Sequence, residues 1–176
     1  PAPSEERYSR AVDVLVELHR HELPDLLPVA PHVSHQLPRY DINAYMIEVD
    51  LLLEWYLPRS GVEVTESMRA AFVTLWRHAL IAPTNAPRTW VLRDYHSPNL
   101  IWLPERNGIA QVGLLDFQDA VMGPGAYDVA SLLQDARVDV PEIMEVKLLN
   151  HYVQSMSELD PSFDPVGFIR IYATLA

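Results

Sequence analysis

Residues 90–103 read Trp90-Val91-Leu92-Arg93-Asp94-Tyr95-His96-Ser97-Pro98-Asn99-Leu100-Ile101-Trp102-Leu103, and residues 112–117 read Val112-Gly113-Leu114-Leu115-Asp116-Phe117. Two apolar runs flank a polar loop that carries Asp94 and Asn99, and a third apolar run ends at Asp116. Short apolar runs bounded by turn-forming residues are typical of strands. The pattern therefore predicts a strand, a loop, a second strand, a turn at residues 104–108 and a third strand.

The polar residues of this stretch are those that phosphoryl transfer from a nucleotide requires. Such a site needs a carboxylate that orients the acceptor hydroxyl and accepts its proton, and oxygen ligands that hold Mg²⁺ against the phosphates. Asp94 fits the first role, and Asn99 and Asp116 fit the second. Mg²⁺ takes only one or two carboxylates from a protein, so one Asp and one Asn suffice. The spacing of Asp94 and Asn99 is also common in ordinary turns, and it is the flanking strands that favour the catalytic interpretation.

Three segments resemble motifs of the aminoglycoside phosphotransferase and choline kinase superfamily, whose members are relatives of the protein kinases. Residues 92–99 resemble its catalytic loop, residues 115–120 its metal-binding segment, and residues 123–132 the segment that follows. The resemblance implies Asp94 as the catalytic base, and Asn99 and Asp116 as the residues that bind Mg²⁺ and, with it, ATP as the co-substrate. It also implies that Asp128 supports the catalytic loop from a following helix, although Asp128 could equally be a helix N-cap.

Leu92 and His96 lie in the same loop as Asp94 and Asn99. Leu92 stands where the superfamily usually has a histidine, and we expect that position to serve packing rather than chemistry. His96 is a candidate contact for the substrate. If His96 were instead a metal ligand together with Asp94 and Asp116, the site would suit a metal-dependent hydrolase.

The composition limits the class of protein. The chain has 176 residues, of which 49% are hydrophobic, so a single domain with one sizeable core is the default. A net charge of −11 argues against partners such as nucleic acid and anionic membrane surfaces. There are no cysteines, which excludes disulfides and thiolate zinc sites, and no apolar run is long enough to cross a membrane. We therefore expect a soluble, cytoplasmic protein.

Two elements of a complete kinase site are missing upstream of Asp94. A kinase needs a Gly-rich loop over the phosphates and a lysine that pairs with them. Gly61 is the only glycine before Asp94, and Lys147 is the only lysine. We therefore expect residues 1–176 to form one domain, the helical C-terminal lobe of a protein-kinase-like fold. The predicted fold class is mainly α with a small β-hairpin (α+β), the N-terminal lobe being absent and the chain truncated at both ends.

Apolar residues at helical spacing predict six helices. They begin at Ser4, Asp41, Thr65, about Tyr127, Asp139 with Pro141, and Asp164 with Pro165. In the second helix, Ile42, Tyr45, Met46, Val49, Leu52, Leu53 and Tyr56 form a continuous apolar stripe, which leaves Glu48, Asp50 and Glu54 on a solvated face. In the third helix, we expect the inward side chains to be those of Met68, Phe72, Leu75, Trp76 and Ala79.

The segment of residues 24–40 contains four prolines, which predicts an ordered, extended loop rather than a regular element. Four histidines lie in or near it, namely His19, His21, His32 and His35. A metal cluster of these histidines is disfavoured, because no carboxylate or thiolate accompanies them at a characteristic spacing.

The acceptor is inferred from a weaker resemblance. Residues 40–58 are similar to a segment of bacterial kinases of this superfamily that phosphorylate the anomeric hydroxyl of N-acetylmuramate and N-acetylglucosamine. This favours transfer of the γ-phosphoryl group of ATP to a sugar or amino sugar, in the context of cell-wall recycling. The alternatives are an aminoglycoside or choline-type phosphotransferase and, from another class, a catalytically silent pseudokinase that acts as a binding scaffold.

Overall fold

The computed structural model describes residues 3–176. The first half of the chain contains α1 (Glu5–His19), β1 (Leu26–Ala30), β2 (Val33–Gln36), α2 (Ile42–Leu51), a π-helical turn (Leu52–Tyr56), α3 (Leu57–Arg59), α4 (Glu66–Ala79) and α5 (Ile81–Asn85). The second half contains β3 (Thr89–Val91), β4 (Leu100–Trp102), β5 (Val112–Leu114), β6 (Val121–Gly123), α6 (Ala126–Leu133), α7 (Glu142–Leu159) and α8 (Pro165–Leu175). Helices with short antiparallel sheets make the fold α+β, as the sequence predicts.

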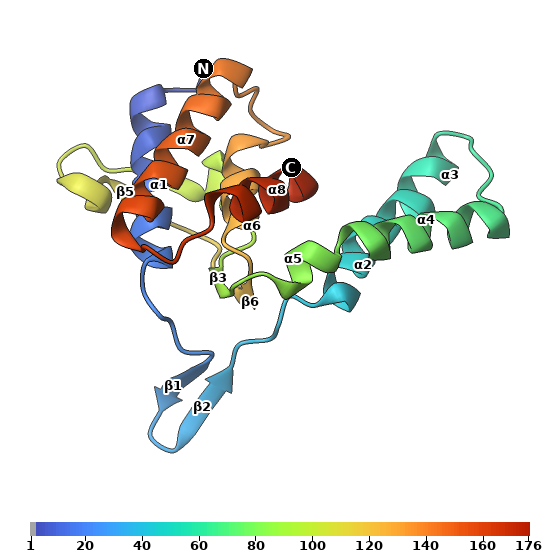
Figure 1. Cartoon of the computed structure of the whole chain (residues 1–176), viewed down its shortest axis with the longest axis horizontal. Coiled ribbons are helices and arrows are strands. Elements are labelled where there is room, and N and C mark those ends of the chain that lie inside the picture. The colour runs from blue at the N-terminus through green and yellow to red at the C-terminus, as the bar shows by residue number, and fades with distance from the viewer. Residues whose placement is uncertain (1–2) are drawn as a thin grey trace.

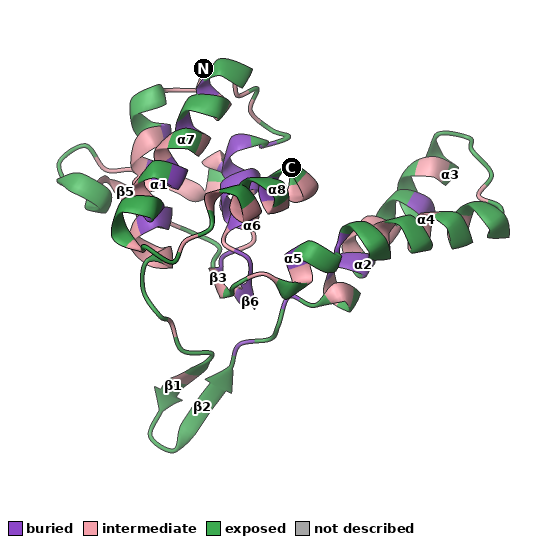
Figure 2. Ribbon diagram, in the orientation of Figure 1, coloured by how far each residue is buried: buried purple, intermediate pink, exposed green. Residues whose placement is uncertain are grey.

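The helices form a body and an arm. In the body, α1 packs against α7 and α6 packs against α8, whereas α2, α3 and α4 extend away from the body as the arm (Figure 1). Figure 2 shows buried residues gathered in the body, whereas most of the arm is exposed. The core of the body consists of Tyr8, Ala11, Val12, Leu15, Val16, Leu92, Tyr95, Ala126, Val129, Ala130, Leu132, Leu133, Met144, Leu148, Tyr152, Val153, Met156 and Tyr172.

A second, smaller core joins the base of the arm to the body. It is formed by Tyr40, Tyr45, Met46, Leu80, Val91 and Val121. Its members come from the segment before α2, from α2, from the residue that follows α4, and from β3 and β6. Since β3 leads directly into the loop that carries Asp94, this core holds the start of that loop against the arm.

The central strands pair as two separate ribbons. Strand β3 is antiparallel to β6, with Trp90 opposite Met122, and β4 is antiparallel to β5, with Ile101 opposite Gly113. The predicted succession of strand, loop, strand, turn and strand is confirmed. The sequence did not predict β6, which is only three residues long and directly follows residues 115–120.

The prediction of an extended loop over residues 24–40 is wrong. Strands β1 and β2 form an antiparallel hairpin with a register irregularity between Pro28 and Ala30. Each strand of a two-stranded ribbon has a free edge, so the missing N–H of Pro28 is tolerated there. His32 takes a positive φ of 62° between the strands. The hairpin extends from the body, and its residues are mostly exposed (Figures 1 and 2).

The predicted helix starts are largely confirmed. The side chains of Asp41, Thr65 and Asp164 each accept a hydrogen bond from a backbone N–H in the first turn of the helix that follows. Ser4 occupies the N-cap position of α1 without a side-chain bond.

The predicted apolar faces of the arm are partly wrong. The π-helical turn at residues 52–56 rotates the residues that follow it, so Leu53 is buried whereas Leu52 and Tyr56 are exposed. On α4, Met68 and Leu75 are also exposed, as is Ala79. The arm packs chiefly helix against helix, so only a narrow face of α4 is covered.

Among the described residues, no helix is both long and apolar enough to cross a membrane.

Candidate active site

The loop between β3 and β4 has a tightly hydrogen-bonded backbone. The Asp94 N–H donates to the carbonyl of Leu92 and the His96 N–H donates to the carbonyl of Asp94, each at 2.9 Å. Arg93 has a φ of 69°, in the left-handed region that is unfavourable for a residue with a side chain. This conformation reverses the chain immediately before Asp94.

Asp128 on α6 holds this reversal. Its two carboxylate oxygens accept hydrogen bonds from the backbone N–H groups of Leu92, at 2.7 Å, and Arg93, at 3.0 Å. These are the contacts expected of a residue that supports the loop. The alternative that Asp128 is an N-cap is wrong, because α6 begins at Ala126 after Gly125. Complete burial raises the pKa of Asp128 to about 7, although the two N–H donors favour the carboxylate.

Asn99 and Asp116 lie at the adjoining ends of β4 and β5. The Leu115 N–H donates to the Asn99 carbonyl at 3.0 Å, which places Asp116 one residue beyond the pair. The Asn99 side-chain amide donates to the Asp94 carbonyl at 3.1 Å. The backbones of the three predicted site residues are therefore brought together. Asp116, like Arg93, is not glycine yet has a positive φ, of 57°.

Asp94 and His96 differ in accessibility. The side chain of Asp94 is 50% exposed, so its carboxylate is accessible to a substrate hydroxyl. His96 is buried, with Nε2 at 3.7 Å from Asp94 Oδ1, and its buried Nδ1 has no partner among the described residues. A substrate contact through His96 would therefore have to occur beside Asp94.

The oxygen atoms of Asn99 and Asp116 are suitable ligands for Mg²⁺. The Asn99 amide nitrogen is already engaged as a donor, which leaves its Oδ1 available to a cation. Asp116 Oδ1 accepts a hydrogen bond from Gln118, which leaves Oδ2 available. Within residues 3–176, no three His, Asp or Glu side chains form a metal cluster, so phosphate and water oxygens would have to complete the shell around an ion held here. Among the described residues, the four histidines between residues 19 and 35 are likewise not part of a metal cluster, and His19 is hydrogen-bonded to the Tyr152 hydroxyl at 2.8 Å.

A contact that the sequence did not predict reaches the loop from the arm. Arg93 Nη2 donates to Glu48 Oε1 at 2.7 Å, so the expectation of a solvated face is wrong for Glu48. Tyr40 also donates to this carboxylate, at 2.5 Å. The sequence carries no local signal for such a contact, because Glu48 and Arg93 are 45 residues apart.

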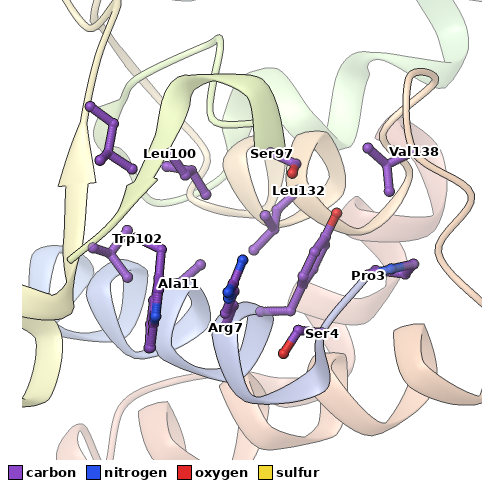
Figure 3. A pocket seen from close by; sticks show the side chains of 12 residues that line it. Pro3, Ser4, Arg7, Ala11, Ser97, Leu100, Trp102, Leu132 and Val138 are labelled. Atoms are coloured by element: carbon purple, nitrogen blue, oxygen red, sulfur yellow. The ribbon is translucent and has the colours of Figure 1, made fainter. Parts of the chain in front are cut away.

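A cavity of about 240 Å³ lies on the side of the loop that faces α1. Arg7, Ala11 and Ser97 are among its lining residues, as Figure 3 shows, and the Arg7 guanidinium lies 5.5 Å from the ring centre of Trp102. Asp94, Asn99 and Asp116 do not line it. The cavity is therefore separate from the three residues to which the sequence assigns the chemistry.

Comparison with known proteins gives consistent matches. Residues 1–161 match the family described as "Phosphotransferase enzyme family". The N-acetylmuramate/N-acetylglucosamine kinase of Caulobacter vibrioides is 35% identical over 161 residues, which are 92% of this chain and 44% of that protein. The protein of the same name from Pseudomonas aeruginosa is 33% identical over 175 residues, which are 97% of this chain and 47% of that protein. The chain thus spans about half the length of these relatives.

Proposed function

The chain belongs to the phosphotransferase enzyme family, and we propose that it is part of an ATP-dependent small-molecule kinase. The enzyme transfers the γ-phosphoryl group to a hydroxyl of a sugar or amino sugar. The observation that carries the proposal is the hydrogen-bonded junction of Asp94, Asn99 and the Leu115–Asp116 segment. It brings a candidate base and two candidate metal ligands to one place, as phosphoryl transfer requires.

In the proposed mechanism, Asp94 orients the acceptor hydroxyl and accepts its proton as the oxygen attacks the γ-phosphorus in line with the leaving ADP. The half-exposed carboxylate of Asp94 supports this role. Asn99 Oδ1 and the Asp116 carboxylate would hold Mg²⁺, which supplies charge neutralisation to the phosphates when it is bound. Asp128 keeps the loop reversed through its bonds to Leu92 and Arg93.

We further propose that residues 1–176 form the C-terminal lobe of the enzyme. The sole lysine, Lys147, lies on α7, and it is ion-paired with Glu5 of α1. The phosphate-binding lysine and Gly-rich loop of a kinase would then come from outside these residues. A match to about half the length of the relatives is consistent with this arrangement.

As acceptor we propose an N-acetylated amino sugar, N-acetylmuramate or N-acetylglucosamine, phosphorylated at the anomeric hydroxyl in the cytoplasm. The relatives from Caulobacter vibrioides and Pseudomonas aeruginosa, both N-acetylmuramate/N-acetylglucosamine kinases, support this choice. The similarity of residues 40–58 to the amino-sugar kinases also supports it. These residues include α2, on which Glu48 accepts a hydrogen bond from Arg93 of the proposed catalytic loop.

The decisive experiment supplies the complete protein with Mg-ATP and one acceptor at a time: N-acetylmuramate, N-acetylglucosamine, kanamycin or choline. ADP release measures turnover, and ³¹P NMR of the product locates the new phosphate. We expect transfer to the anomeric oxygen of the amino sugars. Transfer to kanamycin or choline alone would replace the acceptor. Binding of Mg-ATP without transfer to any acceptor would favour the scaffold, and acceptor-independent hydrolysis would favour a hydrolase.

A further inference from the structure

The carboxylate of Glu48 accepts hydrogen bonds from three side chains. Arg93 of the catalytic loop donates to Oε1 at 2.7 Å. Tyr40, before α2, and Tyr127, on α6, donate to Oε2 at 2.5 Å and 3.5 Å. Glu48 therefore joins the arm to the loop and to the helix that supports the loop.

The aromatic rings around Glu48 limit where the Arg93 side chain can lie. The Tyr40 ring stacks on Tyr45, with ring centres 4.1 Å apart, and both residues are buried. The Arg93 guanidinium lies 5.7 Å from the centre of the Tyr40 ring. The positively charged side chain is thus held between an aromatic face and a carboxylate.

Arg93 is also fixed through its backbone. Its N–H donates to Asp128, and its carbonyl accepts a hydrogen bond from the Ser131 hydroxyl at 3.3 Å. Its left-handed conformation needs such support, because an L-residue does not favour it. The next residue is Asp94, so any relaxation of Arg93 would change the direction in which Asp94 points.

We propose that Glu48 is a positioning residue that acts through Arg93 to fix the orientation of Asp94. This inference rests on the proposed function, because it assigns to Glu48 the alignment of the proposed catalytic base with its acceptor. The Arg93 and Glu48 side chains are 37% and 33% exposed, so solvent weakens their attraction. The pair therefore serves alignment more than overall stability, and errors of about 1 Å in alignment can lower a rate by roughly a hundredfold.

The test compares Glu48→Gln with wild type in the complete protein. We expect kcat to fall by about ten- to a hundredfold, while the KM for the acceptor changes by less than about threefold and the melting temperature barely moves. Glu17→Gln is the matched control, because Glu17 accepts from Arg20 at 2.7 Å with similar exposure, on α1. This control should leave kcat unchanged.

A double mutant tests the route through Arg93. If Glu48 acts through Arg93, Glu48→Gln combined with Arg93→Met should lower kcat no further than Arg93→Met alone. Additive losses would contradict the proposed route. Restoration of most of the lost kcat in Glu48→Asp, which keeps the charge, would support the ion pair as the active element.

Hydrogen exchange separates this inference from the proposed function. Peptides that cover residues 92–99 should exchange faster in Glu48→Gln than in wild type, whether or not a substrate is known. If the wild type transfers phosphate to no acceptor, the proposed function fails. The effect of Glu48 on the loop is then tested by the hydrogen-exchange rates alone. Unchanged exchange in these peptides, or an unchanged kcat in an active enzyme, would overturn the inference.

Discussion

Two residues of the candidate site adopt a backbone conformation that is costly for them. Arg93 and Asp116 both have positive φ, and His32 is the only other such non-glycine among the described residues. Left-handed conformations of this kind cost roughly 1–3 kcal/mol and persist where the surroundings impose them. At Arg93 this support comes from the hydrogen bonds that Arg93 donates to the carboxylates of Asp128 and Glu48. Strain at two positions of one site is consistent with a geometry kept for chemistry.

Asp116 gives a prediction about metal dependence. Asp116→Asn removes a charge that should attract Mg²⁺ while it keeps the size of the side chain. We expect the Mg²⁺ concentration for half-maximal rate to rise about tenfold or more. Asp119→Asn, an exposed aspartate in the same segment, is the control and should leave the Mg²⁺ dependence unchanged. An unaltered dependence in Asp116→Asn would remove Asp116 from the metal site.

Asp128 gives a prediction about pH and stability. Burial raises its pKa from the usual 3.8 to about 7, so between these values the folded protein binds more protons than the unfolded chain. The contribution of Asp128 to the free energy of unfolding must therefore decrease as the pH rises from about 4 to about 7. Relative to Asp128→Asn, which does not titrate, the wild type should lose roughly 2–4 kcal/mol over this interval.

Urea unfolding of both proteins at several pH values measures this difference. Parallel dependence of the two unfolding free energies on pH would show that Asp128 titrates normally in the folded protein.

At the scale of elements, the attachment of the arm depends on a few buried contacts. Leu80, which directly follows α4, is 1% exposed in the small core, whereas Leu75, on α4, is 70% exposed. Leu80→Ala should lower the free energy of unfolding by about 2–5 kcal/mol, because it leaves a cavity. Leu75→Ala should change it by less than about 0.5 kcal/mol. Equal effects of the two substitutions in urea unfolding would contradict the described packing.

Features that depend on neighbouring residues in the chain could be predicted from sequence, whereas the burial of a helix face could not. The caps at Asp41, Thr65 and Asp164 depend on a side chain and an N–H a few residues away, so a local pattern reveals them. The inward face of α4 depends on what lies beside the helix, and little covers Leu75. Helical periodicity alone cannot tell a covered apolar stripe from an uncovered one.

In the candidate site, too, local motifs could be predicted from sequence and a long-range contact could not. Asp94, Asn99 and Asp116 lie in short motifs whose residue types indicate their chemistry. The Glu48–Arg93 contact joins positions 45 residues apart, so the sequence around neither residue indicates it. The β1–β2 hairpin was missed for another reason, since Pro28 indicates a loop unless the strand is known to lie at an edge.

For the whole molecule, the proposed two-lobe arrangement makes a prediction about nucleotide binding. If the Gly-rich loop and its lysine lie outside residues 1–176, these residues alone should bind Mg-ATP at least about tenfold more weakly than the complete protein. Isothermal titration calorimetry of both proteins checks this. Equal affinities would mean that residues 1–176 make all of the phosphate contacts.

The proposed role of Asp94 as the base for the acceptor hydroxyl can be tested through the kinetics of Asp94→Asn in the complete protein. The asparagine keeps the shape of the side chain but cannot accept the proton. We expect kcat to fall by about 10²–10⁴-fold, with the Kd for Mg-ATP within about twofold of wild type. Turnover close to that of wild type would show that Asp94 is not the base.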